Sequence, residues 1–144
     1  MKCRKIIDPQ RDEEEVLLYL KKDSPLADEI VALVESRQRV LTGYREQEIV
    51  PIHPTDVLCF TVENKKVYAR LSQETLLIKL RLYQLEEMLG ERFVKLNQSC
   101  LANMAEIERF QVSVGGALTV IFRNGYRDYV SRRQLTYVKE RFGI

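Results

Sequence analysis

The order of apolar and polar positions divides the chain into a short first part and a longer part rich in strands. Near the N-terminus, the continuous apolar run Val16–Leu20 predicts a strand. Ser24-Pro25 then predicts the N-cap and first position of a helix that ends near Arg37. Its apolar residues recur at the spacing of one buried face: Leu26, Ile30, Leu33 and Val34. We therefore expect residues 1–44 to form a small strand–helix unit.

The remainder of the chain predicts short strands joined by tight turns. The expected strands are Val40–Tyr44, Glu48–Ile52, Val57–Val62, Val67–Leu71, Thr75–Ile78, Phe93–Leu96, Cys100–Ala102, Ile107–Val114, Ala117–Arg123 and Tyr126–Val130. Gly115-Gly116 and Asn124-Gly125 are the residue pairs that two-residue hairpin turns favour. One helix of about three turns is marked by Leu82, Leu85, Met88 and Leu89 and stops at Gly90. This pattern is typical of a mostly β domain with few short helices.

The chain closes with a well-specified helix. Ser131 is placed to be its N-cap, and Gln134 three residues later completes the sequence of a capping box. Leu135, Val138 and Phe142 then share one apolar face. This helix is therefore expected to pack against the strands that precede it.

Arg132 and Arg133 occupy the first turn of that helix, which is an unfavourable place for a cation. The helix dipole disfavours each by about 0.3–1 kcal/mol. A bound phosphate would reverse this argument, because backbone N–H groups and two guanidinium groups would then face an anion. The alternative is that both side chains point to solvent or pair with Asp128 or Glu140. The residues alone leave both interpretations open.

Two further polar clusters lie in turns. Residues 64–66 (Asn-Lys-Lys) stand at a hairpin tip, where lysine is also an ordinary solubilising choice and the structural interpretation is favoured. Residues 97–99 (Asn-Gln-Ser) separate two short strands. Their amides match the hydrogen-bonding pattern of adenine in the major groove, but they also suit the capping of backbone groups in a turn. The sequence leaves both roles open for residues 97–99.

Overall charge changes this picture little. The 144 residues contain 23 basic and 21 acidic side chains, a net charge of +2, which by itself does not indicate a nucleic-acid partner. The charge is uneven, however: residues 121–144 hold six basic side chains against Asp128 and Glu140. Since a polyanion responds to local rather than total charge, the C-terminal part is the candidate basic surface.

The inventory of reactive residues argues against an enzyme or a metal protein. The one histidine, His53, lies in an expected loop, and the three cysteines at positions 3, 59 and 100 are widely separated. Cys59 and Cys100 stand among apolar residues, which predicts small buried hydrophobic side chains. Hydrolase, phosphate-loop and dinucleotide motifs are absent from the sequence. We expect no catalytic residues, no metal and no cofactor.

The sequence also predicts a cytoplasmic location. No apolar run reaches the roughly 18 residues that a membrane helix needs. The first residues are basic but lack the apolar stretch of a signal peptide.

Two segments resemble the motifs of a known family. Phe93–Asn103 (FVKLNQSCLAN) resembles the central motif of the LytTR DNA-binding domain, in which a Phe, a basic residue, a polar triplet ending in Ser and a later Asn recur at this spacing. Asn124-Gly125 followed by Tyr129–Arg133 resembles the closing segment of the same family. The resemblance covers about residues 45–144.

The resemblance implies an antiparallel β fold whose loops, rather than a recognition helix, enter successive major grooves of double-stranded DNA. Members of this family are bacterial transcription regulators that commonly bind repeated sites as dimers. On this chain the expected DNA-binding residues are Asn64, Lys65, Lys66, Lys95, Asn97, Gln98, Ser99, Arg132 and Arg133. We therefore expect residues 45–144 to be the DNA-binding domain of a homodimer.

The chain also departs from the family pattern. Lys95 stands where an arginine is common, and Asn97 where a histidine is common, which suggests a different base preference. Residues 1–44 are too few for the receiver domain that many members carry, so the chain resembles the stand-alone branch, some of whose members are controlled by a companion membrane protein. The N-terminal unit is expected to serve dimerisation or signal input.

Two other functions stay open at the level of sequence. A protein-interaction module would bind another polypeptide and show no salt-dependent DNA binding. Binding of single-stranded RNA would need stacking aromatic side chains beside basic ones, for which Tyr68 and Tyr126 are available.

Overall fold

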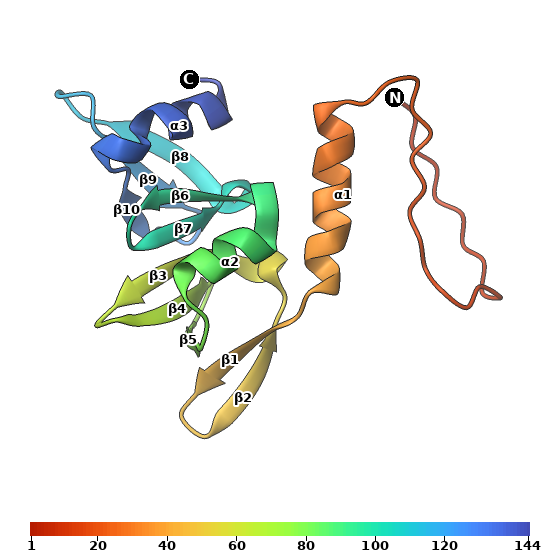
Figure 1. The fold of residues 1–144 in the computed structure, drawn as a ribbon, viewed down its shortest axis with the longest axis horizontal. Helices are drawn as coiled ribbons and strands as arrows, with labels where there is room; N and C mark the ends of the chain where they lie inside the picture. Colours follow the sequence, from red (N-terminus) through yellow and green to blue (C-terminus); the bar gives the residue numbers. More distant parts are fainter.

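The computed structural model describes residues 1–144, apart from the side chains of residues 36–38. Three helices and ten strands follow one another along the chain (Figure 1). In chain order they are α1 (Pro25–Gln38), β1 (Leu41–Arg45), β2 (Glu48–Ile52), β3 (Val57–Glu63), β4 (Lys66–Leu71), β5 (Thr75–Ile78), α2 (Leu82–Leu89), β6 (Phe93–Asn97), β7 (Cys100–Asn103), β8 (Ile107–Val112), β9 (Leu118–Phe122), β10 (Arg127–Tyr129) and α3 (Arg132–Phe142). Short 3-10 turns at Pro54–Asp56, Gly90–Arg92 and Met104–Glu106 join some of these elements.

The strands form two antiparallel sheets. Seven strands lie in the order β2-β1-β5-β4-β3-β7-β6, and three lie in the order β10-β9-β8. Every pairing between neighbouring strands is antiparallel. The predicted fold class, mostly β with few short helices, is therefore confirmed. Within the described residues, no helix is long and apolar enough to cross a membrane.

Two apolar cores hold the sheets together. The first joins the larger sheet to α2 and includes Phe60 and Phe93, whose ring centroids are 5.6 Å apart. The second lies between the larger sheet, the smaller sheet and α3, and it buries Cys59 and Cys100 as predicted. Val138 is buried there, and Leu135 and Phe142 pack against it, which confirms the predicted apolar face of α3. Because α3 packs on this core, its first turn is held at one end of the sheets.

The predicted turns and caps are present. Asn64 and Lys65, between β3 and β4, both have positive φ, at 51° and 64°, as a two-residue hairpin turn of type I′ requires. Gly125 turns the chain between β9 and β10 with φ 91°. Ser24 Oγ accepts a hydrogen bond from Ala27 N at 3.2 Å, which confirms it as the N-cap of α1. Residues that specify tight turns and helix starts thus act locally, as expected.

Only half of the predicted capping box of α3 forms. Ser131 Oγ accepts a hydrogen bond from Gln134 N at 3.3 Å. The backbone N–H of Ser131 donates instead to Leu96 O of β6 at 2.9 Å, so it is not available to the Gln134 side chain. A tertiary contact therefore replaces the second, local half of the motif.

The predicted strand Val16–Leu20 is wrong. This segment lies outside every helix and strand of the structure, and Leu17 and Tyr19 are 63% and 90% exposed. Figure 1 shows the first residues as an extended arm beyond α1, away from both sheets. An apolar run forms a strand only where a neighbouring strand satisfies its backbone groups, and none is within reach of this arm.

The predicted buried face of α1 is also wrong in part. Leu26 and Leu33 are 46% and 40% exposed, whereas Ala27 is buried and Ile30 and Val34 are half-buried. The helix contacts the chain near Pro54–Asp56 and Gly90–Arg92. Helical spacing identifies residues that share a face, but the neighbours decide which face is covered.

Strand β1 joins the N-terminal part to the larger sheet. It pairs with β2 and with β5, so residues 41–44 lie within the sheet, and the division at residue 44 stays a prediction. A Cβ at Gly43 would stand 2.5 Å from Ile52 Cδ1 and 3.0 Å from Leu76 Cβ, so a larger residue would require both neighbours to shift. The β1 strand is therefore packed closely against its neighbours.

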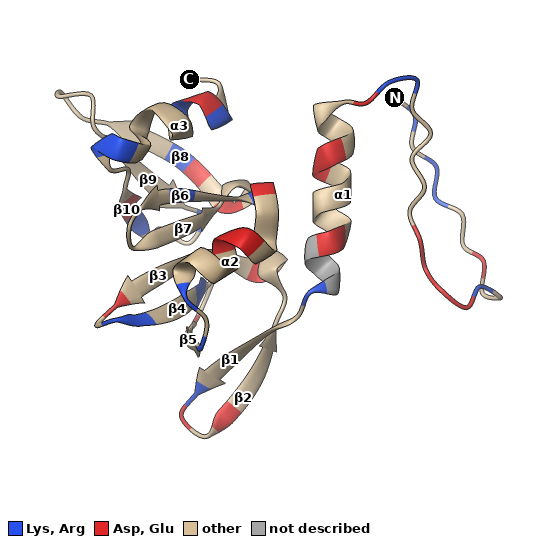
Figure 2. Cartoon of the chain, in the orientation of Figure 1, with Lys and Arg blue, Asp and Glu red and all other residues tan. Residues whose placement is uncertain are grey.

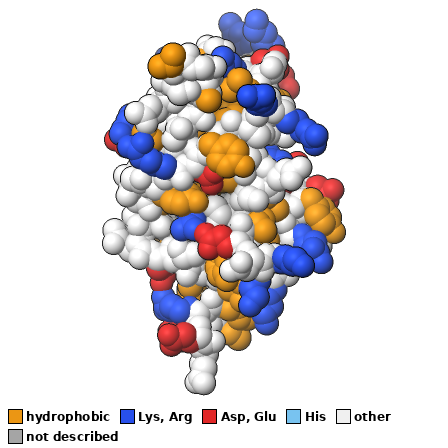
Figure 3. Space-filling view, turned by 90° about the vertical axis from the view of Figure 1, so that its left-hand side faces the viewer, with side chains coloured by type: hydrophobic (Ala, Val, Ile, Leu, Met, Phe, Trp, Pro, Cys, Tyr) orange, Lys and Arg blue, Asp and Glu red, His pale blue; other side chains and the backbone are white. Residues whose placement is uncertain are grey.

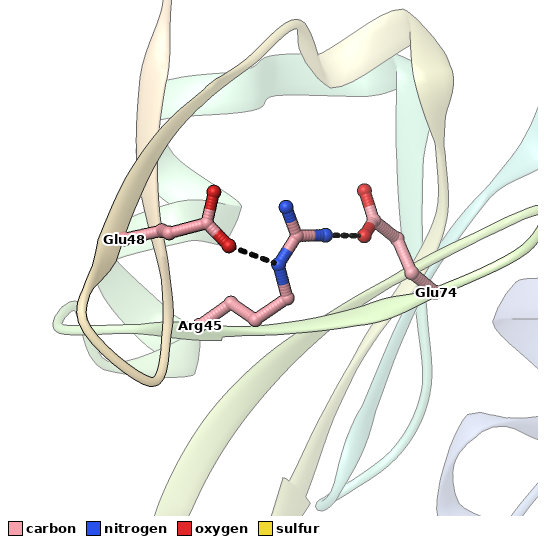
Figure 4. Close-up of polar contacts among 3 residues, drawn as sticks. All are labelled: Arg45, Glu48 and Glu74. Atoms are coloured by element: carbon pink, nitrogen blue, oxygen red, sulfur yellow. Dashed lines mark hydrogen bonds and ion pairs between the residues drawn. The ribbon is translucent and has the colours of Figure 1, made fainter.

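Arg45 ties the end of β1 to two neighbouring segments (Figure 4). Its Nε donates to Glu48 Oε1 at 3.3 Å, and another guanidinium nitrogen pairs with Glu74. The hydrogen bond to Glu48, together with the charge of Glu74, raises the pKa of Arg45. These groups are largely exposed to solvent, so the pairs orient the β1–β2 hairpin more than they stabilise the fold.

Candidate nucleic-acid interface

The three predicted polar clusters lie at one end of the molecule. The β3–β4 turn, the β6–β7 turn and the start of α3 all face the left-hand edge of Figure 1. Figure 2 shows basic residues at the β3–β4 turn and at the start of α3, and the face seen in Figure 3 carries basic side chains around apolar ones. Segments far apart in the sequence thus form one surface.

Backbone hydrogen bonds connect these three segments. Val62 N, near the end of β3, donates to Ser99 O of the β6–β7 turn at 2.9 Å. Ser131 N, at the start of α3, donates to Leu96 O at 2.9 Å. The β6–β7 turn is therefore attached on one side to the β3–β4 hairpin and on the other to α3.

Arg132 and Arg133 are exposed in the first turn of α3. Both side chains point to solvent, which is one form of the alternative interpretation. The other form, pairing with Asp128 or Glu140, does not occur: within the described side chains, no hydrogen bond or ion pair is formed by either guanidinium group. Both cations stand at the positive end of the helix dipole without a compensating acid. This arrangement favours an approaching anion.

The β3–β4 turn also presents free cations. Lys65 at the turn and Lys66 at the start of β4 are exposed, and neither ammonium group has a partner among the described residues. The neighbouring carboxylate of Glu63 is paired with Arg70, which offsets its charge. The tip of the hairpin is therefore locally positive.

Asn97 is 2% exposed and its side-chain amide is fully used. Nδ2 donates to Asp128 Oδ1 at 3.0 Å and to Tyr129 O at 2.8 Å, and Oδ1 accepts from Ser99 N at 2.8 Å. This is the capping role that the sequence left open, and it leaves no free amide hydrogen for a base. Asn97 is thus an internal residue of the surface rather than a contact residue.

Gln98 and Ser99 are the exposed members of the same turn. Lys95 is half-buried in β6, paired in register with Leu101, and lies before the turn rather than in it. The structure therefore brings Gln98 and Ser99 to the same end as the two arginines, and places Lys95 further along the strand.

Lys79 was not expected at this surface. Ile78 pairs with Val67, so Lys79 follows at the end of β5 beside Lys66. It is exposed, and its Nζ lies 4.1 Å from the ring centroid of Tyr44. The sequence shows that residue 79 ends a strand, but only the register of β4 and β5 brings it to the basic end.

Asp128 and Tyr126 are further residues of this end that were not among the expected DNA-binding residues. Tyr126 OH donates to Asp128 Oδ2 at 3.3 Å, and Arg70 lies over the Tyr126 ring, 4.3 Å from its centroid. Burial, followed by the charge of Asp128, raises the pKa of Tyr126. The phenol therefore stays protonated and can donate to the carboxylate.

The two buried cysteines lie beneath the same turn. A hydrogen bond with Cys59 raises the pKa of Cys100, and burial raises it further. Cys100 is thus an inert neutral thiol in the core. Within the described residues, no group of three or more His, Cys, Asp or Glu side chains could hold a metal ion.

Comparison with known proteins gives the following similarities. The family model of the LytTr DNA-binding domain matches residues 47–143. Two proteins of Staphylococcus aureus, strains MSSA476 and MW2, both named HTH-type transcriptional regulators, are 31% identical over the full length of this chain and 99% of their own. Among solved structures, the LytTr DNA-binding domain of a response regulator from Bacillus cereus superposes with a TM-score of 0.69. At 22% identity it covers 73% of this chain and 97% of that domain, and it shows the same fold.

Proposed function

Because the chain belongs to the LytTr DNA-binding domain family, we propose that it is a cytoplasmic transcription regulator that binds specific sequences of double-stranded DNA. The observation that carries the proposal is the gathering of three exposed polar segments at one end: Lys65 and Lys66, Gln98 and Ser99, and Arg132 and Arg133. Three separate protrusions on one face suit successive major grooves, which a single flat patch would not follow.

Each segment is assigned a role by its chemistry. Arg132 and Arg133 contact phosphates or the O6 and N7 atoms of guanine, because guanidinium groups donate two parallel hydrogen bonds. Gln98 reads a base edge through its free amide. Lys65 or Lys66 holds the phosphate backbone as a point charge. Asn97 supports this surface from inside and does not touch DNA.

The test is a gel-shift series over salt concentration, with duplex DNA from upstream of the protein's own gene. Binding should weaken with salt, with a log–log slope of about −0.9 for each phosphate neutralised. Arg133→Ala should lower the magnitude of this slope by about 1 and reduce affinity by roughly 1–3 kcal/mol. Folding should be unaffected, because the Arg133 side chain makes no contact with a described acid.

Lys21→Ala is the matched control. It removes one equally exposed cation from the N-terminal arm, away from the three segments. If folded Arg133→Ala bound DNA as tightly as Lys21→Ala, the proposed surface would be wrong. A stable complex with a specific polypeptide and no salt-dependent DNA binding would instead favour a protein-interaction module.

Three finer parts of the proposal rest on family resemblance. The protein binds repeated sites as a homodimer, residues 1–44 serve dimerisation or signal input, and a companion membrane protein controls it. Sedimentation analysis of the full chain, alone and with a two-site duplex, tests the first part: a single copy per duplex at saturation would contradict it. Co-purification with the product of a neighbouring membrane-protein gene tests the last.

A further inference from the structure

We propose that Asp128 is a positioning residue for the DNA-binding surface, holding the β6–β7 turn in a fixed place relative to the start of α3. This inference rests on the proposed function, because it concerns how the same surface is assembled. Asp128 does not itself touch DNA in this proposal. It acts by holding in place the segments that contact DNA.

Both oxygens of the Asp128 carboxylate are occupied by protein donors. Oδ1 accepts hydrogen bonds from Asn97 Nδ2 at 3.0 Å and from the backbone N–H of Tyr129 at 2.8 Å. Oδ2 accepts from Tyr126 OH at 3.3 Å. A carboxylate held from three directions has one orientation, and its donors are held in turn.

The bond to Asn97 joins two segments that are 31 residues apart in the sequence. Asn97 begins the turn that presents Gln98 and Ser99, and its Oδ1 also accepts a hydrogen bond from Ser99 N at 2.8 Å. Asp128 lies in β10, whose end leads directly into Ser131 and α3. This contact therefore acts together with the bonds from Asn97 Nδ2 to Tyr129 O and from Ser131 N to Leu96 O to hold Gln98 in place relative to the two arginines.

Tyr126 also links Asp128 to the β3–β4 hairpin, the third segment of the surface. The Tyr126 ring supports Arg70, and Arg70 Nε donates to Thr61 Oγ1 at 3.0 Å. Arg70 also pairs with Glu63, the residue directly before the β3–β4 turn. A continuous path of polar contacts thus runs from the hairpin tip through Tyr126 and Asp128 to Asn97.

A purely electrostatic role for Asp128 and a positioning role predict opposite changes in DNA affinity when Asp128 is removed. If Asp128 were only an acid near a DNA-binding surface, its removal would reduce repulsion of phosphates and strengthen binding. If it positions the surface, its removal lets the β6–β7 turn move and weakens binding. The sign of the change in affinity therefore separates the two roles.

The experiment measures affinity of the full chain for the duplex that the wild-type protein enriches from a pool of random duplexes. Asp128→Ala should weaken binding to this duplex by about tenfold, the size expected for the loss of charged hydrogen bonds. The salt slope should stay as in the wild type, because the phosphate-binding cations are unchanged. Asp128→Asn keeps an acceptor oxygen for Asn97 and Tyr129 and should recover most of the affinity.

Glu29→Ala is the charge-matched control, since it removes one exposed acid from α1 and should leave affinity unchanged or slightly higher. The proposal would be overturned if the Asp128→Ala variant bound DNA as tightly as the Glu29→Ala variant. It would also be overturned if the Asp128→Asn variant bound DNA as weakly as the Asp128→Ala variant. If Asp128→Ala does not fold, Tyr126→Phe removes only the hydroxyl donor and should weaken binding a few-fold, whereas unchanged affinity would overturn the proposal.

The two proposals fail in different ways. A wild-type protein that enriches no duplex would overturn DNA binding itself, and the positioning role with it. A wild-type protein that binds its duplex normally while Asp128→Ala binds equally well would overturn the positioning role alone.

Discussion

Neighbouring residues of the same chemical type play different roles in this protein. Asn97 and Gln98 both carry amides, and both stand in one turn. Asn97 is buried with every donor and acceptor occupied, whereas Gln98 is exposed. Because a buried amide without partners would be costly, Asn97 maintains the turn, and only Gln98 is available to an outside partner.

The half-buried phenol of Tyr126 makes the stability of the fold sensitive to alkaline pH. Burial raises the pKa of Tyr126 above the ordinary value of 10.0. Above pH 10.0 the unfolded chain loses this proton while the folded chain keeps it. The contribution of Tyr126 to stability is therefore complete below that pH and declines as pH rises.

Tyr126→Phe should remove the part of the stability loss at alkaline pH that comes from the Tyr126 phenol. Urea unfolding of the wild type and of Tyr126→Phe, followed over pH values on both sides of 10.0, measures the difference between their midpoints. A difference that stays constant across this pH range would contradict the prediction.

At the scale of elements, α1 and α3 begin in the same way and serve different ends. Each has a serine N-cap whose Oγ accepts from the backbone N–H three residues later. Helix α3 carries two arginines in its first turn that have no partner among the described side chains, and it is tied to β6 through Ser131 N. Helix α1 lies on the other side of the molecule from the proposed DNA-binding surface (Figure 1).

These two caps provide a matched pair of variants. Ser131→Ala and Ser24→Ala should each lower the free energy of unfolding by about 1 kcal/mol, through loss of the capping hydrogen bond. Only Ser131→Ala should also weaken DNA binding, because it loosens the turn that carries Arg132 and Arg133. Denaturant unfolding and gel shifts on both variants check this. Equal losses of DNA affinity in the two variants would argue against a role for the start of α3.

At the scale of the whole molecule, the chain separates into a packed part and an exposed arm. The two sheets, α2 and α3 share two cores, whereas large apolar side chains of the arm such as Ile7, Leu17 and Tyr19 are well exposed. The net charge of +2 averages these parts, so it conceals the basic end formed by turns of the packed part. Local arrangement of charge, not its total, is what a polyanion meets.

Removal of residues 1–22 should leave the free energy of unfolding of the monomer within about 0.5 kcal/mol of the wild type. The deleted residues bury little surface, and Asp23 is retained because its Oδ1 accepts from Ser24 N at 2.9 Å. Urea unfolding of both proteins at low concentration measures this. A clear loss of stability would mean that the arm packs against the domain.

Most of the strands and turns could be predicted because their signals are local. Asn64 and Gly125 have positive φ, a conformation that asparagine and glycine adopt more readily than other residues. Ser131 and the apolar spacing of Leu135 and Val138 specify α3 in the same local way. The exposure of Lys65, Lys66, Gln98 and Ser99 followed from their places in or beside turns, and that of Arg132 and Arg133 from the start of a helix, whereas Asn97 is buried.

The sequence by itself therefore determined the succession of strands, turns and caps and the residue types available at the candidate surface. The tertiary structure alone decided that Val16–Leu20 stays unpaired, that Leu26 and Leu33 remain exposed, and that Lys79 lies beside Lys66. It also decided that Asn97 binds Asp128. Strand pairing, burial and hydrogen bonding between distant segments depend on which neighbours arrive in space, and local sequence patterns do not specify those neighbours.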